Sequence, residues 1–132
     1  MSTQSTDTTT GITHLEVVSV PVSDQERAKS FYADVLGFAV IADSAFEDQR
    51  WVQLVPPGST ASITLVTWFE SMPPGSLKGL VLATEDIRAS YDALAARGLQ
   101  WNGPIEDASW GTFAMFDDPD GNSWIVSQSR AG

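Results

Sequence analysis

The chain has 132 residues, seven Lys and Arg against seventeen Asp and Glu, a net charge of −10 and no cysteine. This length predicts a single domain, large enough to bury a core without covalent staples. The missing cysteines exclude disulfides and thiolate chemistry and fit a reducing, cytoplasmic setting. The acidity disfavours nucleic acid and anionic membranes as partners, because phosphates are neutralised by clustered Lys and Arg. It serves solubility, or it attracts a cationic ligand.

The first eleven residues, MSTQSTDTTTG, contain neither a basic segment nor an apolar run. They predict a disordered tail at residues 1–11 rather than a signal peptide. No later apolar run approaches the ~20 residues that a membrane span requires. One domain is therefore expected over residues 12–130.

Two segments have the apolar spacing of an amphipathic helix. In residues 23–37 this stripe follows a capping box of Ser23 and Glu26 and stops at a glycine, and residues 84–98 repeat the stripe and the stop. Strand-like runs surround both helices. They lie at residues 14–22 before the first helix, 38–43, 50–55 and 61–68 after it, 77–84 before the second helix, and 99–102, 112–117 and 123–128 after that.

The order of elements is therefore β-α-β-β-β twice, with a joint at residues 70–76 and modules at about residues 12–69 and 77–130. A repeated order suggests an internal duplication of the fold. The predicted fold class is α+β, in which one helix covers one face of each small mixed sheet. Two such sheets set side by side form a cup with their uncovered faces.

Three stretches carry a resemblance: VSDQERAKSFYADVLGF at residues 22–38, LVLATEDIRASYDALAARG at residues 80–98, and WGTFAMFDDPDGNSW at residues 110–124. With the double element order, they resemble the vicinal oxygen chelate superfamily, also called the glyoxalase/bleomycin resistance/dioxygenase superfamily. The likeness covers nearly all of the chain outside the tail. Within it, DPDGN predicts a turn rather than a calcium loop, because an EF-hand needs further oxygen ligands at fixed offsets.

Metal-using members of the superfamily place His, Glu or Gln at four strand positions facing the cup. The resemblance maps these positions onto Val17, Thr64, Gly79 and Ile125. None of these residues is a ligand for a divalent ion, so we expect neither metal nor cofactor. The single histidine, His14, lies three residues before Val17 and therefore points to the opposite face of a strand. Without Cys, G-x-S-x-G or a second His, no catalytic residue is predicted.

Alternation along each strand predicts which side chains line the cup. Val52 and Leu54 suit the helix side, which leaves Trp51 and Gln53 toward the cup, and the same rule sends Trp124 to the helix side. A tryptophan in the ASWG loop is either a rim residue or an interface anchor. The predicted ligand-binding residues are Val17, Trp51, Gln53, Thr64, Val66, Trp68, Trp110 and Ile125.

Apolar walls with scattered hydroxyls, one amide and several indoles are typical of a pocket for an organic ligand. Indoles stack on aromatic ligands and attract cations. Resemblance to the bleomycin-resistance branch then implies a metal-free protein that sequesters an aromatic or cationic toxic compound such as an antibiotic. The alternative is a lyase, isomerase or oxygenase of the same superfamily with an unconventional active site, and a regulatory or structural module is a third possibility. We expect a homodimer, because small cups of this superfamily commonly close by pairing and an open apolar face favours association.

Overall fold

A computed structural model describes residues 10–129, apart from the side chain of Phe46. The tail predicted for residues 1–11 therefore lies outside the described residues except for Thr10 and Gly11. Within the described part of the chain, no helix is both long and apolar enough to cross a membrane.

The chain forms two modules with the same order of elements. Module 1 contains β1 (Val17–Pro21), α1 (Gln25–Ser30), the π-helix η1 (Phe31–Val35), β2 (Ala39–Phe46), β3 (Gln49–Val55) and β4 (Ser62–Val66). Module 2 contains β5 (Leu80–Ala83), α2 (Ile87–Ala96), β6 (Glu106–Ala108), β7 (Gly111–Asp117) and β8 (Ser123–Ser129).

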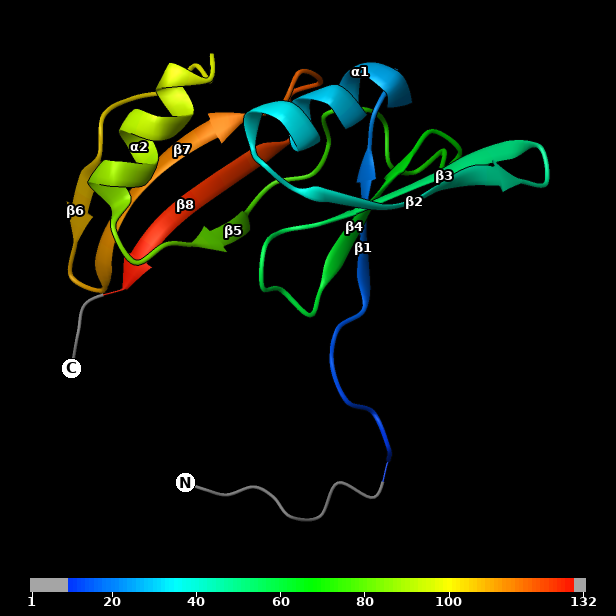
Figure 1. Ribbon diagram of the computed structural model, residues 1–132, viewed down its shortest axis with the longest axis horizontal. Helices are drawn as coiled ribbons and strands as arrows, with labels where there is room; N and C mark the ends of the chain where they lie inside the picture. The colour runs from blue at the N-terminus through cyan, green and yellow to red at the C-terminus, as the bar shows by residue number, and fades with distance from the viewer. Residues whose placement is uncertain (1–9, 130–132) are drawn as a thin grey trace.

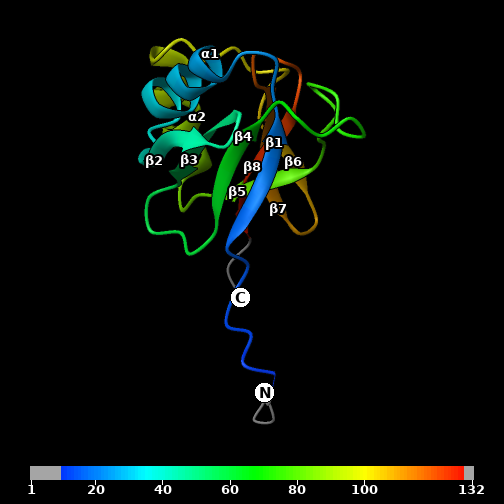
Figure 2. The ribbon, with the colours of Figure 1, turned by 90° about the vertical axis from the view of Figure 1, so that its right-hand side faces the viewer.

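Each module is a four-stranded mixed sheet, with strand orders β1-β4-β3-β2 and β5-β8-β7-β6. The first strand of each module pairs in parallel with the last strand, and the other pairs are antiparallel. Figure 1 shows the two sheets side by side, with α1 and α2 along the upper side of the view. Figure 2 looks from the end of module 1, so that β1 and β4 lie in front of β8. The predicted α+β class with two βαβββ modules is confirmed.

The first helix begins one residue later than the predicted capping box. Asp24 is the N-cap, with its side chain accepting a hydrogen bond from the Arg27 amide at 3.0 Å. The Ser23 hydroxyl instead donates to the Asp120 carboxylate in module 2, at 2.6 Å. The capping box of Ser23 and Glu26 was therefore wrong, because a long-range acceptor engages the serine.

The segment after α2 differs from the strand predicted at residues 99–102. Gly98 ends the helix at φ +102°, as predicted, but the Leu99 amide still closes the last turn of α2. Only Trp101 pairs with a strand, as an isolated bridge to Phe116. The short strand β6 forms later, so the order of elements survives the shift.

One apolar core runs beneath both helices and includes residues of both modules. Tyr32 and Phe38 of module 1 contact Trp124 of module 2, with ring centroids 5.7 Å and 6.2 Å apart. Trp124 in turn stacks on Phe116 at an interplanar angle of 2°. The helix-covered faces of the two sheets thus share their packing. We call the opposite side of each sheet, away from its helix, the open face.

Candidate ligand-binding site

Strand β3 alternates between core and open face. Val52 and Leu54 are fully buried in the core. Trp51 and Gln53 are half-buried on the other side of the strand, where the Gln53 side chain reaches Ser62 of β4. The predicted orientation of these four β3 residues is therefore present in the structure.

A chain of hydrogen bonds crosses the open face of module 1. The Trp51 indole Nε1–H donates to Gln53 Oε1 at 2.9 Å, and Gln53 Nε2 donates to Ser62 Oγ at 2.7 Å. The Ser62 hydroxyl then donates to the Glu16 carbonyl at 3.0 Å. A carboxamide has two donor hydrogens and two acceptor lone pairs, and this chain uses one of each. The Gln53 amide is thus held in one orientation and keeps further hydrogen-bonding capacity.

Two predicted binding residues of β4 lie beneath the surface. Thr64 and Val66 are each 1% exposed. The Thr64 hydroxyl donates to the Val52 carbonyl at 3.1 Å, so it satisfies the neighbouring strand rather than a ligand. Alternation gave their face correctly, but residues on one face need not be equally accessible. In this conformation they form the floor of the open face.

The open face of module 2 is apolar and exposed. Ile125 of β8 lies between Val81 of β5 and Met115 of β7, in register with both. Val81 is 58% exposed and Met115 is 42% exposed. Phe113 lies on the same face, two residues before Met115 and opposite Ser127. A row of aliphatic side chains therefore crosses three strands without a cover in the described part of the chain.

Trp110 adds an aromatic surface next to this row. It lies in the turn between β6 and β7 and is 54% exposed. Its ring stacks on Phe113, with centroids 5.2 Å apart and an interplanar angle of 21°. Two nearly parallel rings at the sheet edge give a flat ligand a face on which to stack.

Alternation within β7 alone does not tell on which face of the sheet Phe113 and Met115 lie. Their direction follows from the register of the β7–β8 hairpin, in which Met115 faces Ile125. The sequence does contain the signal that sets this register, since the DPDGN turn fixes where β7 ends and β8 begins. Counting outward from that turn pairs the two strands residue by residue.

Trp68 stands apart from the other predicted residues. Strand β4 ends at Val66, so alternation does not extend to Trp68. Its half-buried ring lies against Phe69, with centroids 6.0 Å apart. Val17, the first residue of β1, is half-buried and pairs with Ser62. Apart from Trp68, the structure therefore brings the predicted residues together in two groups, one in each module, rather than in one enclosed site.

The predicted turn at DPDGN is present, and the Asp118 carboxylate organises its hydrogen bonds. Asp118 Oδ1 accepts the amides of Asp120 and Asn122, each at 2.9 Å. Asp118 Oδ2 accepts the Tyr32 hydroxyl at 2.6 Å and the Asn122 side-chain amide at 2.8 Å. Trp124 Nε1 donates to the Tyr32 oxygen at 2.9 Å. Burial, followed by the Asp118 charge, raises the pKa of Tyr32 far above its usual range. These groups satisfy one another and join the modules.

The four positions at which the resemblance implies metal ligands carry poor ligands here. Val17 and Thr64 lie in module 1, Ile125 lies in β8, and Gly79 precedes β5. They supply no imidazole and no carboxylate, so a divalent ion does not fit these positions. Among residues 10–129, no three His, Cys, Asp or Glu side chains are grouped to hold an ion elsewhere.

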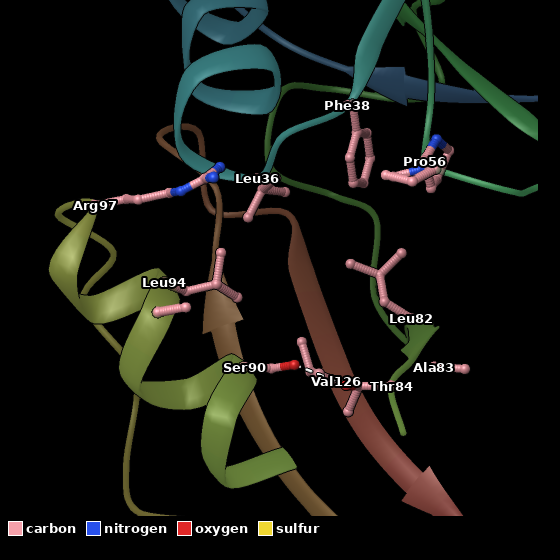
Figure 3. Close-up of a pocket in the computed structure, with 12 residues that line it drawn as sticks. Leu36, Phe38, Pro56, Leu82, Ala83, Thr84, Ser90, Leu94, Arg97 and Val126 are labelled. Atoms are coloured by element: carbon pink, nitrogen blue, oxygen red, sulfur yellow. Dashed lines mark hydrogen bonds between the residues drawn. The ribbon is translucent and has the colours of Figure 1, made fainter. Parts of the chain in front are cut away.

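A pocket of about 400 Å³ lies on the helix side, where the modules meet. Figure 3 shows it between α2 and the segment around Phe38. None of the eight predicted binding residues lines it. It is thus separate from the open faces.

The two βαβββ modules and their open faces define a small α+β fold, and a family model matches nearly all of it. The model described as the Glyoxalase/Bleomycin resistance protein/Dioxygenase superfamily matches residues 11–126. The chain belongs to this superfamily, which confirms the resemblance seen in its sequence motifs.

Three relatives illustrate the similarity. The crystal structure of TnmS3, an antibiotic binding protein from Streptomyces sp. CB03234, resembles this chain with a TM-score of 0.86 and a sequence identity of 47%. The match covers 91% of this chain and 98% of the TnmS3 chain. The crystal structure of a glyoxalase/bleomycin resistance protein from the same organism also has 47% sequence identity to this chain, with a TM-score of 0.79. The match covers 87% of this chain and 100% of that protein's chain. The protein YetH of Bacillus subtilis (strain 168) is 31% identical over 119 residues, which are 89% of this chain and 99% of YetH.

Proposed function

We propose that this protein binds an antibiotic or a similar toxic compound with a flat aromatic part and sequesters it without a metal. The observation that carries the proposal is the exposed apolar open face of module 2, where Trp110 stacks on Phe113 beside Met115. The similarity to an antibiotic binding protein supports the same ligand class.

The two open faces supply complementary chemistry. The Trp110–Phe113 pair and the Ile125 row provide stacking and apolar burial. The Gln53 amide, held by Trp51, provides a directed donor and acceptor. The net charge of −10 adds an attraction for a cationic ligand. A ligand with a planar aromatic body and an amine matches all three features.

We further propose that the site is completed in a homodimer. In one chain the predicted residues fall into a module 1 group and a module 2 group. A second copy that covers the open face of module 2 would remove exposed Val81 and Met115 from water. Its own module 1 would then face the same ligand.

Binding can be tested with two antibiotics, daunorubicin and tetracycline, after the protein has been dialysed against a chelator. We expect at least one to quench tryptophan fluorescence at one ligand per chain. Replacing Trp51 or Trp110 by Ala should then weaken binding by about 1–3 kcal/mol through lost stacking, while the fold remains intact.

The matched control is His14→Ala, which truncates an exposed aromatic ring before β1. This variant should bind as the unaltered protein does. Loss of binding in all three variants, or no binding by either compound, would contradict the proposal. Turnover of either compound after addition of Fe²⁺, Mn²⁺, Ni²⁺ or Zn²⁺ would favour the alternative, an enzyme with an unconventional active site.

A further inference from the structure

The helix-side pocket is built from both modules. Leu36 and Phe38 come from the segment around the end of η1 in module 1. Leu82, Leu94 and Val126 come from β5, α2 and β8 of module 2. Figure 3 shows these five apolar side chains around one space. Its volume of about 400 Å³ falls within the range of small-molecule pockets.

Polar groups lie at two places in the pocket. The hydroxyls of Thr84 and Ser90 are 2.7 Å apart and bond to each other. Arg97 lies at the end of α2, and its side chain extends beside Leu36 (Figure 3). An apolar space with one cation and a hydroxyl pair suits an amphipathic anion better than a neutral hydrocarbon.

Arg97 differs from several basic residues of this acidic chain. Arg27, Lys29 and Arg50 each have a carboxylate within 3.4 Å. Within residues 10–129, Arg97 has no such partner, and its Nη1 reaches only the Val35 carbonyl, at 3.5 Å. A guanidinium presents its donors as a planar fork that matches a carboxylate.

The net charge of −10 repels anions through acidic side chains that are spread along the whole sequence. At physiological ionic strength, charges on the surface are screened beyond about 8 Å. A carboxylate in direct contact with Arg97 therefore experiences chiefly that guanidinium. A local cation can select an anion in an acidic protein.

We propose that this pocket binds a small apolar carboxylate, with its ring or chain between Leu36 and Leu94 and its carboxylate on Arg97. The site is distinct from the open faces, and the inference goes beyond the proposed antibiotic binding. It would stand if no antibiotic bound.

Arg97 also has a structural role that the test must separate from binding. It is the C-cap residue of α2, where a positive charge interacts favourably with the negative end of the helix dipole. Its replacement can therefore lower thermal stability without any ligand. A comparison between charged and neutral probes of the same shape removes this effect, because stability acts on both equally.

The probes are 1-naphthoate and its neutral counterpart 1-naphthalenemethanol, titrated by calorimetry. We expect naphthoate to bind more tightly, and Arg97→Gln to weaken naphthoate at least fivefold while leaving the alcohol unchanged. Arg88→Gln, on an exposed residue of the same helix outside the pocket, is the matched charge control and should change neither. Ala93→Leu, which adds bulk to the lining, should weaken both probes.

Amide chemical shifts in a ¹⁵N spectrum locate the bound probe. Perturbations at Leu36, Leu82 and Leu94 are expected. The proposal is overturned if the shifts fall only on the open faces, if Arg97→Gln and Arg88→Gln act alike, or if Ala93→Leu leaves naphthoate binding unchanged.

Discussion

The Tyr32 hydroxyl is the atom at which polar groups of the two modules meet. It donates to Asp118 and accepts from Trp124, and all three side chains are buried. Each of these groups would lose a hydrogen-bond partner if the oxygen were removed. A buried polar group without a partner costs more than the bond itself contributes, so this single atom matters to stability.

Tyr32→Phe should therefore lower the free energy of unfolding by about 1–3 kcal/mol, measured by urea denaturation. Ligand binding at the open faces should not change, because the Tyr32 ring lies in the core on the helix side. A variant as stable as the unaltered protein would show that the network contributes no net stability.

The same residue predicts a dependence on alkaline pH. The pKa of Tyr32 is raised in the folded state, chiefly by burial and then by the Asp118 charge, so the folded protein keeps the proton where the unfolded chain loses it. The stabilisation is complete below the unfolded pKa of about 10 and is lost as the pH rises above it. The unfolding free energy should fall more steeply above that pH in the unaltered protein than in Tyr32→Phe. Parallel slopes would contradict this assignment.

At the scale of elements, the connection between modules rests on the DPDGN turn. Gly75, at φ +83°, donates its amide to the Pro21 carbonyl at 3.4 Å. A Cβ on Gly75 would collide with the backbone carbonyl oxygen of Asp120. Gly79 has the same φ of +83°, but a Cβ there meets no described atom within 4 Å.

Comparing alanine substitutions at these two glycines separates the cost of a left-handed backbone from the cost of a steric collision. Gly79→Ala should destabilise the protein by about 1–2 kcal/mol, the cost of left-handed backbone alone. Gly75→Ala should add about 1–3 kcal/mol for the collision. Thermal melts of both variants measure the difference. Equal melting temperatures would mean that the connecting segment moves away from the turn without cost.

Alternation and helical spacing were sufficient to predict the elements that bury one face. Val52 and Leu54 fix the orientation of β3 in this way. They were not sufficient beyond the ends of strands, as Trp68 shows, because the two-residue period holds only while the chain is extended. Nor do they give accessibility, since Thr64 lies on the open face and is still buried. Accessibility depends on neighbouring strands, which a single run of residues does not contain.

At the scale of the whole molecule, an exposed apolar face exists in a strongly acidic chain. Val81, Met115 and Trp110 favour association, while the charge of −10 on each copy opposes it. Salt screens the repulsion and leaves the apolar attraction in place. Association should therefore tighten as salt is added.

We predict a homodimer at micromolar concentration, measured by light scattering, whose dissociation constant falls between low and physiological salt. Val81→Glu should shift the protein toward the monomer, because it places a charge in the apolar face. Ala95→Glu adds the same charge on an exposed residue of α2 and is the control. A monomeric mass at both salt concentrations would refute the dimer, and equal effects of the two variants would place its interface elsewhere.

The shared hydrogen bonds around Tyr32 also constrain how the chain can be recombined. Its two halves repeat one topology, yet Tyr32 belongs to the first half, and Asp118, Asn122 and Trp124 belong to the second. A chimera joined at residues 70–76 inherits one side of this network from each parent. A chimera of two relatives is therefore expected to be more stable when both parents carry compatible groups at these positions, because a mismatch leaves a buried polar group without its partner.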